Sequence, residues 1–192
     1  MPTYASCRMG GLIVVVCAAL AGGCGSEDSG AVAATKTPIG LLTELARRSG
    51  RRDVDGVVAL LAEDARTQGG RQWLEFADRT AASSTLTAIR AIPQGERRNL
   101  EALSGEEFLR KLDAISPQAF ASLFRCNYVA DFEEAGRVLV YARNDDGKVF
   151  YLGLARQEKG ALQLLGEAEA RKLLDALRVK LNEKLRADGA TG

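Results

Sequence analysis

The sequence contains no histidine, and its 192 residues include only four cysteines and four prolines. The lack of histidine excludes Ser-His-Asp and Cys-His catalytic arrangements, histidine general bases and histidine metal ligands. Charge of one sign is also lacking, since 26 basic residues face 25 acidic ones, so no surplus charge attracts nucleic acid. The remaining composition, 46% hydrophobic and 27% charged, is that of a globular protein of one domain.

A long hydrophobic run is missing as well, because the apolar stretch 12–21 has ten residues and a membrane-spanning helix needs about 20. A short apolar stretch that follows a basic residue, here Arg8, is typical of an export signal. The stretch ends in Leu20-Ala21-Gly22-Gly23-Cys24, which resembles the lipobox of bacterial lipoprotein precursors. The alternative is an ordinary secretory signal that is cut after Ala21.

The lipobox resemblance implies that Cys24 receives a diacylglycerol and becomes the first residue of the mature chain. We therefore expect a cell-envelope protein that is anchored on the exported side of a membrane by its N-terminal lipid. Because Gly25 rather than Asp follows the cysteine, the resemblance favours the outer membrane in a host that has one. Acylation of Cys24 would leave Cys126 without a disulfide partner in the mature chain.

The sequence divides into a signal peptide over residues 1–23, a flexible tether over 24–36 and a single globular domain over 37–188. Helix starts are predicted where a capping residue precedes an apolar pattern. The segment 83–92 is compatible with either helix or strand. The predicted starts lie at Thr37-Pro38, Asp53, Ser104 and Ser116-Pro117, and Trp73, Leu74 and Phe76 indicate a further helical turn.

The pattern changes after residue 125 to short β-rich runs that are separated by turn residues, which predicts an antiparallel meander of about four strands. The expected strands are Cys126–Phe132, Arg137–Arg143, Lys148–Ala155 and Ala161–Leu165. Apolar residues then recur at helical spacing, which predicts a C-terminal amphipathic helix. They are Ala170, Leu174, Leu177, Leu181 and Leu185. The fold class is therefore α+β, with N-terminal helices, the meander and the terminal helix.

Segments 51–61 and 146–156 together resemble the nuclear-transport-factor-two-like superfamily of cone-shaped α+β domains. The resemblance implies a cavity rather than a particular reaction. Apolar walls with a few hydroxyl groups are typical of ligand pockets, although aromatic residues in a domain of this size are more often core. The candidate pocket residues are Trp73, Tyr128, Asp131, Tyr141 and Tyr151, with Phe150 as a further aromatic candidate.

Four other features each have two interpretations, a chemical role and a purely structural one. Asp131, Glu133 and Glu134 are candidates for a general base or form a solvated turn, and Cys126 is a reactive thiol or a buried strand residue. The segment 144–147 offers oxygen atoms to a cation but lacks the spacing of a calcium loop, so a hairpin turn is expected. A basic cluster is a candidate for contact with anionic lipid headgroups, and the alternative is that it is the solvated link between two helices. It consists of Arg47, Arg48, Arg51 and Arg52.

These features favour a lipid-anchored envelope protein with a non-catalytic α+β domain that binds a protein or a small ligand. The alternatives are a small pocket-type enzyme that uses carboxylate or tyrosine chemistry and a structural subunit of envelope assembly that acts through its terminal helix. We expect no cofactor, metal or catalytic constellation and no nucleic-acid partner.

Overall fold

The computed structural model describes residues 35–189, with side chains up to residue 180. The predicted signal peptide, Cys24 and the first part of the tether lie outside the described residues. Contacts with the domain begin at Thr35, whose backbone carbonyl accepts a hydrogen bond of 2.9 Å from the amide of Leu162. The next carbonyl, of Lys36, accepts from the Arg156 side chain at 3.3 Å. The described fold therefore includes the two residues before Thr37.

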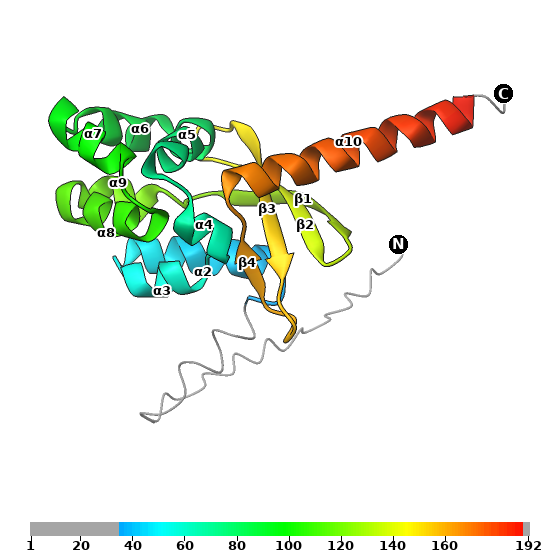
Figure 1. Ribbon diagram of the computed structural model, residues 1–192, viewed down its shortest axis with the longest axis horizontal. Helices are drawn as coiled ribbons and strands as arrows, with labels where there is room; N and C mark the ends of the chain where they lie inside the picture. Colours follow the sequence, from blue (N-terminus) through cyan, green and yellow to red (C-terminus); the bar gives the residue numbers. More distant parts are fainter. Residues whose placement is uncertain (1–34, 190–192) are drawn as a thin grey trace, which may run out of the picture.

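A series of short helices precedes the sheet, and one long helix follows it (Figure 1). The helices before the sheet are α2 (Pro38–Gly50), α3 (Val54–Ala59), α4 (Glu63–Thr67), α5 (Gly70–Thr80), α6 (Ser83–Arg90), α7 (Gln94–Glu101), α8 (Gly105–Ile115) and α9 (Pro117–Ser122). The helix after the sheet is α10 (Glu167–Gly189). The α+β class is thus confirmed, and the segment that was compatible with helix or strand is helix α6.

Capping explains where two of the predicted helices begin. The hydroxyl of Thr37 accepts a hydrogen bond of 3.1 Å from the amide of Gly40, and Pro38 holds the first helical position of α2. At α8 the Glu107 carboxylate accepts from the amide and the hydroxyl of Ser104, at 3.1 and 2.8 Å. These bonds hold the pKa of Glu107 below its ordinary value. Both starts are as the sequence predicted.

The sheet is a four-stranded antiparallel meander in the order β1-β2-β3-β4. Its strands are β1 (Asn127–Glu134), β2 (Arg137–Arg143), β3 (Val149–Arg156) and β4 (Leu162–Leu164). The β1–β2 turn contains Ala135 and Gly136 with φ of 50° and 74°, and the positive φ at both positions suits the twist of a tight hairpin. The four expected strands are confirmed: β2 has the expected ends, and the ends of the other three differ by one or two residues.

The turn between β2 and β3 connects the sheet to the helices, because Asn144 is buried under it. The Asn144 amide group donates hydrogen bonds to the carbonyls of Thr80 and Ala81, and its oxygen accepts from the amides of Asp146 and Lys148. Asp146 in turn accepts from Ser83 at the start of α6. The expected hairpin turn is confirmed, and it also fixes the position of the α5–α6 junction.

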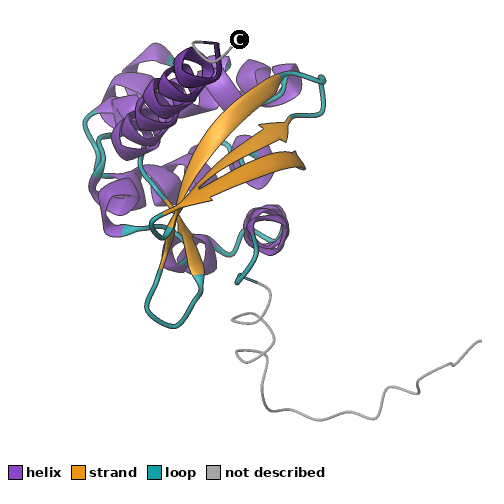
Figure 2. Cartoon of the chain, turned by 90° about the vertical axis from the view of Figure 1, so that its right-hand side faces the viewer, coloured by secondary structure: helices purple, strands orange, loops and turns teal. Residues whose placement is uncertain are grey.

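Alternate strand residues face two different apolar clusters. Figure 2 shows the strands of the sheet lying among the helices. One face, which we call the helix-side face, packs against the helices that precede the sheet through Val138, Val140, Phe150 and Leu152 among others. The opposite face, which we call the α10 face, packs Leu139, Tyr141 and Tyr151 against α10. Alternation in the strands therefore buries both faces of the central strands.

Two contacts fix α10 on its face of the sheet. Gly153 lies where the helix crosses β3, and a Cβ atom there would come within 2.8 Å of the Ala170 Cα atom. Arg79 of α5 reaches across to donate hydrogen bonds of 2.5 Å to the Tyr151 carbonyl and to Glu167, and its guanidinium lies 4.2 Å from the centre of the Tyr151 ring. Past its contacts with the sheet, α10 continues away from the body of the domain (Figure 1).

Candidate functional site: a closed core and an open apolar groove

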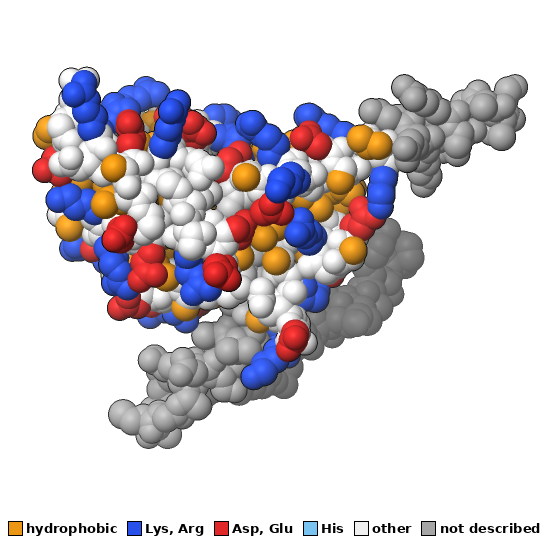
Figure 3. Space-filling model, viewed as in Figure 1, with side chains coloured by type: hydrophobic (Ala, Val, Ile, Leu, Met, Phe, Trp, Pro, Cys, Tyr) orange, Lys and Arg blue, Asp and Glu red, His pale blue; other side chains and the backbone are white. Residues whose placement is uncertain are grey.

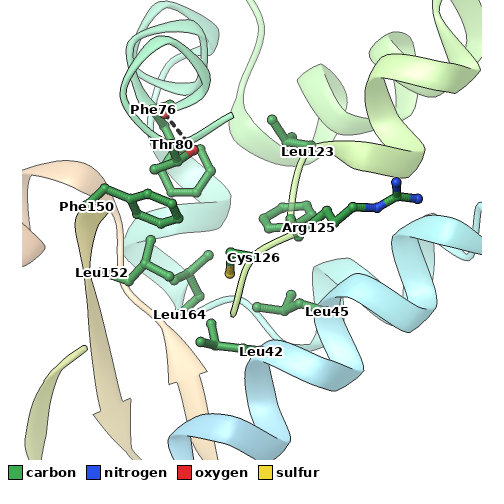
Figure 4. A pocket seen from close by; sticks show the side chains of 11 residues that line it. Leu42, Leu45, Phe76, Thr80, Leu123, Arg125, Cys126, Phe150, Leu152 and Leu164 are labelled. Carbon is green, nitrogen blue, oxygen red and sulfur yellow. Dashed lines mark hydrogen bonds between the residues drawn. The ribbon is translucent and has the colours of Figure 1, made fainter. Parts of the chain in front are cut away.

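The interface between the helices and the sheet is almost filled. Figure 4 shows the cavity found there, whose volume is about 10 Å³, room for no more than one water molecule. Hydrophobic side chains form most of its wall. The lining residues are Leu42, Leu45, Phe76, Thr80, Leu123, Phe124, Arg125, Cys126, Phe150, Leu152 and Leu164. This space does not provide the ligand cavity that the cone-shaped resemblance implies.

Cys126 lies in the wall of this small cavity (Figure 4). Burial, together with the negative charge of Asp145, raises the pKa of the Cys126 thiol to about 12. A reactive cysteine needs a lowered pKa, so the environment favours the interpretation of Cys126 as a small apolar residue.

Trp73 and Phe150, two of the aromatic candidates, also belong to the closed side. Trp73 is 1% exposed, donates its indole N–H to the Ala65 carbonyl at 3.2 Å and packs against three phenylalanine rings. Phe150 is buried against the small cavity. Both side chains are core in this structure.

Tyr128 and Asp131 lie together on the helix-side face of β1. Residues three apart in a regular strand face opposite sides of the sheet. A bulge between Tyr128 and Ala130 changes this alternation, so Tyr128 and Asp131 face the same side. The Tyr128 hydroxyl donates to the Asp131 carboxylate, which raises the pKa of Tyr128. A tyrosine that serves as a base or nucleophile needs the opposite change, so this pair does not favour tyrosine chemistry.

The other two β1 carboxylates also have partners. Glu133 receives two hydrogen bonds from Arg156, at 2.8 and 2.7 Å, which lower the pKa of Glu133. Glu134 pairs with Lys180 of α10. The three carboxylates were expected in a solvated turn or at a catalytic site, whereas the structure places them at the end of β1 in separate pairs.

The α10 face contains an open hollow, which we call the apolar groove. It has a volume of about 300 Å³ and lies between α10 and the β1–β2 half of the sheet. Figure 3 shows hydrophobic side chains exposed beside α10 and bordered by charged ones. The lining residues are Phe132, Leu139, Tyr141, Leu174, Leu177, Arg178 and Lys180.

The apolar groove has a floor of apolar side chains, and two cationic side chains, Arg178 and Lys180, lie at one side of it. The rings of Phe132 and Tyr141 meet edge to face with centres 6.1 Å apart. Phe132, in the edge strand β1, is 55% exposed although its side chain is aromatic. No carboxylate is among the lining residues. Such a surface suits the binding of an apolar segment and offers no general acid or base pair.

The structure therefore separates the five candidate pocket residues. Tyr141 lines the apolar groove, and Tyr151 lies opposite it on β3 under α10. Tyr128 and Asp131 are on the other face, and Trp73 is in the core. The groove residues that the candidate set omitted are Phe132 and Leu139, whose signal was their place on the same strand face as Tyr141, and Leu174 and Leu177 of the predicted helix stripe.

The basic cluster at the α2 end is mostly paired. Arg47 and Arg48 both donate to Glu44 at 2.6 Å, and Arg52 donates to Asp113 at 2.7 Å. Pairing of this kind fits a link between two helices. Within the described residues, no group of three or more cysteine or carboxylate side chains is arranged to hold a metal ion. The helices among those residues include none that combines the length and apolar character needed to cross a bilayer.

Comparison with known proteins gives no relative: no family model, no curated protein and no solved structure matches this chain.

Proposed function

We propose that this protein is an exported, lipid-anchored protein of the cell envelope whose α+β domain binds a protein partner through the apolar groove, without catalysis. The observation that carries the binding role is the open apolar lining of the groove beside a core that is otherwise filled. The support for the anchor is the short apolar run that ends in Ala21-Gly22-Gly23-Cys24.

A non-catalytic role is supported by the partners of the polar candidates. Asp131, Glu133 and Glu134 are each paired, the thiol of Cys126 has a raised pKa, and none of these four residues lines the apolar groove. Apolar floors flanked by charged residues are typical of sites that take an apolar helix or strand of a partner.

The anchor is tested by metabolic labelling with palmitate. The wild-type chain should take up label and fractionate with membranes, and Cys24→Ala should lose both properties, because one cysteine carries the lipid. Cys126→Ala is the matched control and should label like the wild type. Label that persists in Cys24→Ala contradicts the lipoprotein assignment.

The binding role is tested with a photo-crosslinking amino acid at position 132 of the full chain in living cells. The matched control places the same amino acid at position 149, because Val149 is equally exposed at 55% but does not line the groove. Irradiation should give a crosslinked product with a second polypeptide from position 132 and not from position 149. The absence of a product from position 132 contradicts a protein-binding groove.

A further inference from the structure

The two edges of the sheet differ in their main-chain hydrogen bonds. At the β4 edge, the amide of Leu162 donates to the Thr35 carbonyl at 2.9 Å. The amide of Leu164 donates to the Leu60 carbonyl at 2.9 Å, and the Leu164 carbonyl accepts from the amide of Ala62 at 2.8 Å. Other segments of the same chain therefore close the β4 edge.

The β1 edge is open at the end near the hairpin turn. The two-residue turn makes Glu134 and Arg137 a hydrogen-bonded pair, and such pairs alternate along an antiparallel ladder. Phe132 therefore bonds to β2, whereas the amides and carbonyls of Asp131 and Glu133 point away from the sheet. Helix α2 packs near β1, but within residues 35–189 no hydrogen bond reaches these outward groups.

An edge of this kind recognises an extended segment. A β-strand presents amides and carbonyls at the spacing of the outward groups, so it can bond to them as an added strand of the sheet. The side chains of an added strand alternate between the two faces, and each lies beside a side chain of the edge strand. The side chains of β1 therefore set the pattern that a partner strand needs.

On the α10 face an added strand would lie beside Phe132. The ring of Phe132 is 55% exposed at the border of the apolar groove. An apolar side chain opposite this ring would remove it from water and extend the floor of the groove. The partner residue at this position is therefore expected to be apolar.

On the helix-side face an added strand would lie beside two carboxylates. Tyr128 uses one oxygen of Asp131, and the second oxygen has no hydrogen bond within the described part of the chain. Glu133 is bonded to Arg156, yet its side chain is still 45% exposed. A carboxylate accepts several hydrogen bonds, so each of the two has room for a basic partner side chain. A second copy of β1 would instead place acid beside acid.

We propose that the β1 edge binds an extended segment of another protein as an added strand, in which the residue beside Phe132 is apolar and its two neighbours are basic. This inference rests on the proposed function, because Phe132 belongs both to the apolar groove and to the edge. It adds to that function the form of the partner segment, a strand, and the pattern of its side chains.

The test compares two substitutions at position 133 of the full-length chain, with the photo-crosslinking amino acid at position 132 in living cells. Glu133→Pro removes the outward amide, and proline is tolerated in an edge strand where the N–H faces away from the sheet. Glu133→Ala removes the same side chain but keeps the amide, so it is the matched control. Circular dichroism of both purified variants checks that the sheet is retained.

The yield of crosslinked product should be at least about tenfold lower for Glu133→Pro than for Glu133→Ala, because the proline ring blocks main-chain pairing. Equal yields from the two variants overturn the added strand but leave a protein-binding groove in place. No product from position 132 when Glu133 is unchanged overturns both proposals.

A charge reversal tests the side-chain pattern without changing the main chain. Glu133→Lys should reduce the product at least about fivefold, because it places a cation beside the basic residues of the partner. Glu158→Lys, in the exposed turn between β3 and β4, is the matched control and should leave the yield within about twofold. Equal yields from the two reversals overturn the proposal.

Mass spectrometry of the product from the chain with Glu133 unchanged locates the attachment in the partner. The expected site is an apolar residue that has a basic residue on each side. An attachment in a segment without this pattern overturns the proposal, whatever the yields.

Discussion

The two faces of the sheet are made by alternate residues of the same strands, yet different helices cover them and leave different amounts of open space. Val138 and Val140 face a core to which every helix from α2 to α9 contributes, and only about 10 Å³ of space is left there. Leu139 and Tyr141, their neighbours in β2, face a single helix and a hollow of about 300 Å³. The difference assigns stability to the helix-side face and supports the proposed binding role of the α10 face.

The largest effect should follow from removing an aromatic side chain on the helix-side face. Trp73→Ala should lower the free energy of unfolding by about 3 to 5 kcal/mol, because the indole is fully buried among rings. Phe132→Ala, on the α10 face, should cost less than about 1 kcal/mol, because its ring is half exposed. Urea denaturation of both variants checks the comparison, and equal losses would show that the two faces do not differ.

A leucine under α10 should have an intermediate effect. Leu174→Ala should lower the free energy of unfolding by about 2 to 3 kcal/mol, since Leu174 is buried but borders a hollow that already admits solvent. Val179→Ala on the exposed side of the same helix is the control and should change stability little. Thermal unfolding with both variants measures the contribution of the docked half of α10.

The crossing of α10 over β3 should be sensitive to a single added methyl group. Gly153→Ala should cost about 1 to 3 kcal/mol, because its Cβ would press on the Ala170 backbone. Gly95→Ala places its Cβ in open space and is the matched control. If denaturation midpoints show no greater loss for Gly153→Ala than for the control, α10 does not pack as closely as described.

Acid should weaken the helix-side layer through Glu44. Hydrogen bonds from Arg47, with a further one from Arg48, lower the pKa of Glu44 from its ordinary value to about 2, and the side chain is 8% exposed. Because the folded state has the lower pKa, the stabilisation is complete above about pH 4.5 and is lost as the pH falls toward 2.

Glu44→Gln should therefore cost about 1 to 2 kcal/mol at pH 7 and less at pH 3. The control Glu75→Gln removes an exposed pair with Arg71 and should cost less than about 1 kcal/mol at pH 7. Urea titrations at the two pH values make the measurement. A loss for Glu44→Gln that is the same at pH 3 and pH 7 contradicts the assignment of the pKa to this residue.

Local signals predicted much of the fold. Period-two alternation and turn residues located all four strands, and the caps at Thr37 and Ser104 located two helix starts. The short helices α4 and α7 were not predicted, because Glu63–Thr67 and Gln94–Glu101 are polar segments with little apolar periodicity. Their helical form depends on tertiary packing, such as the burial of Ala65 and Leu100.

The site was less predictable than the fold. Aromatic composition pointed to Tyr141 and Tyr151 but also to Trp73, since a sequence does not show which side of a sheet an aromatic residue faces until the partner layers are known. The groove exists because α10 crosses over β3 and β2 and leaves the ring of Phe132 half covered. That crossing depends on long-range contacts, among them Gly153 with Ala170 and Arg79 with Glu167, which local pattern does not encode.

The most direct test of the functional α10 face is photo-crosslinking from position 132 of the full-length protein in living cells, with position 149 as the control. The account predicts a crosslinked product with a second polypeptide from position 132 alone, because Phe132 lines the groove and Val149 does not. Equal yields from the two positions, or no product from position 132, would contradict the account.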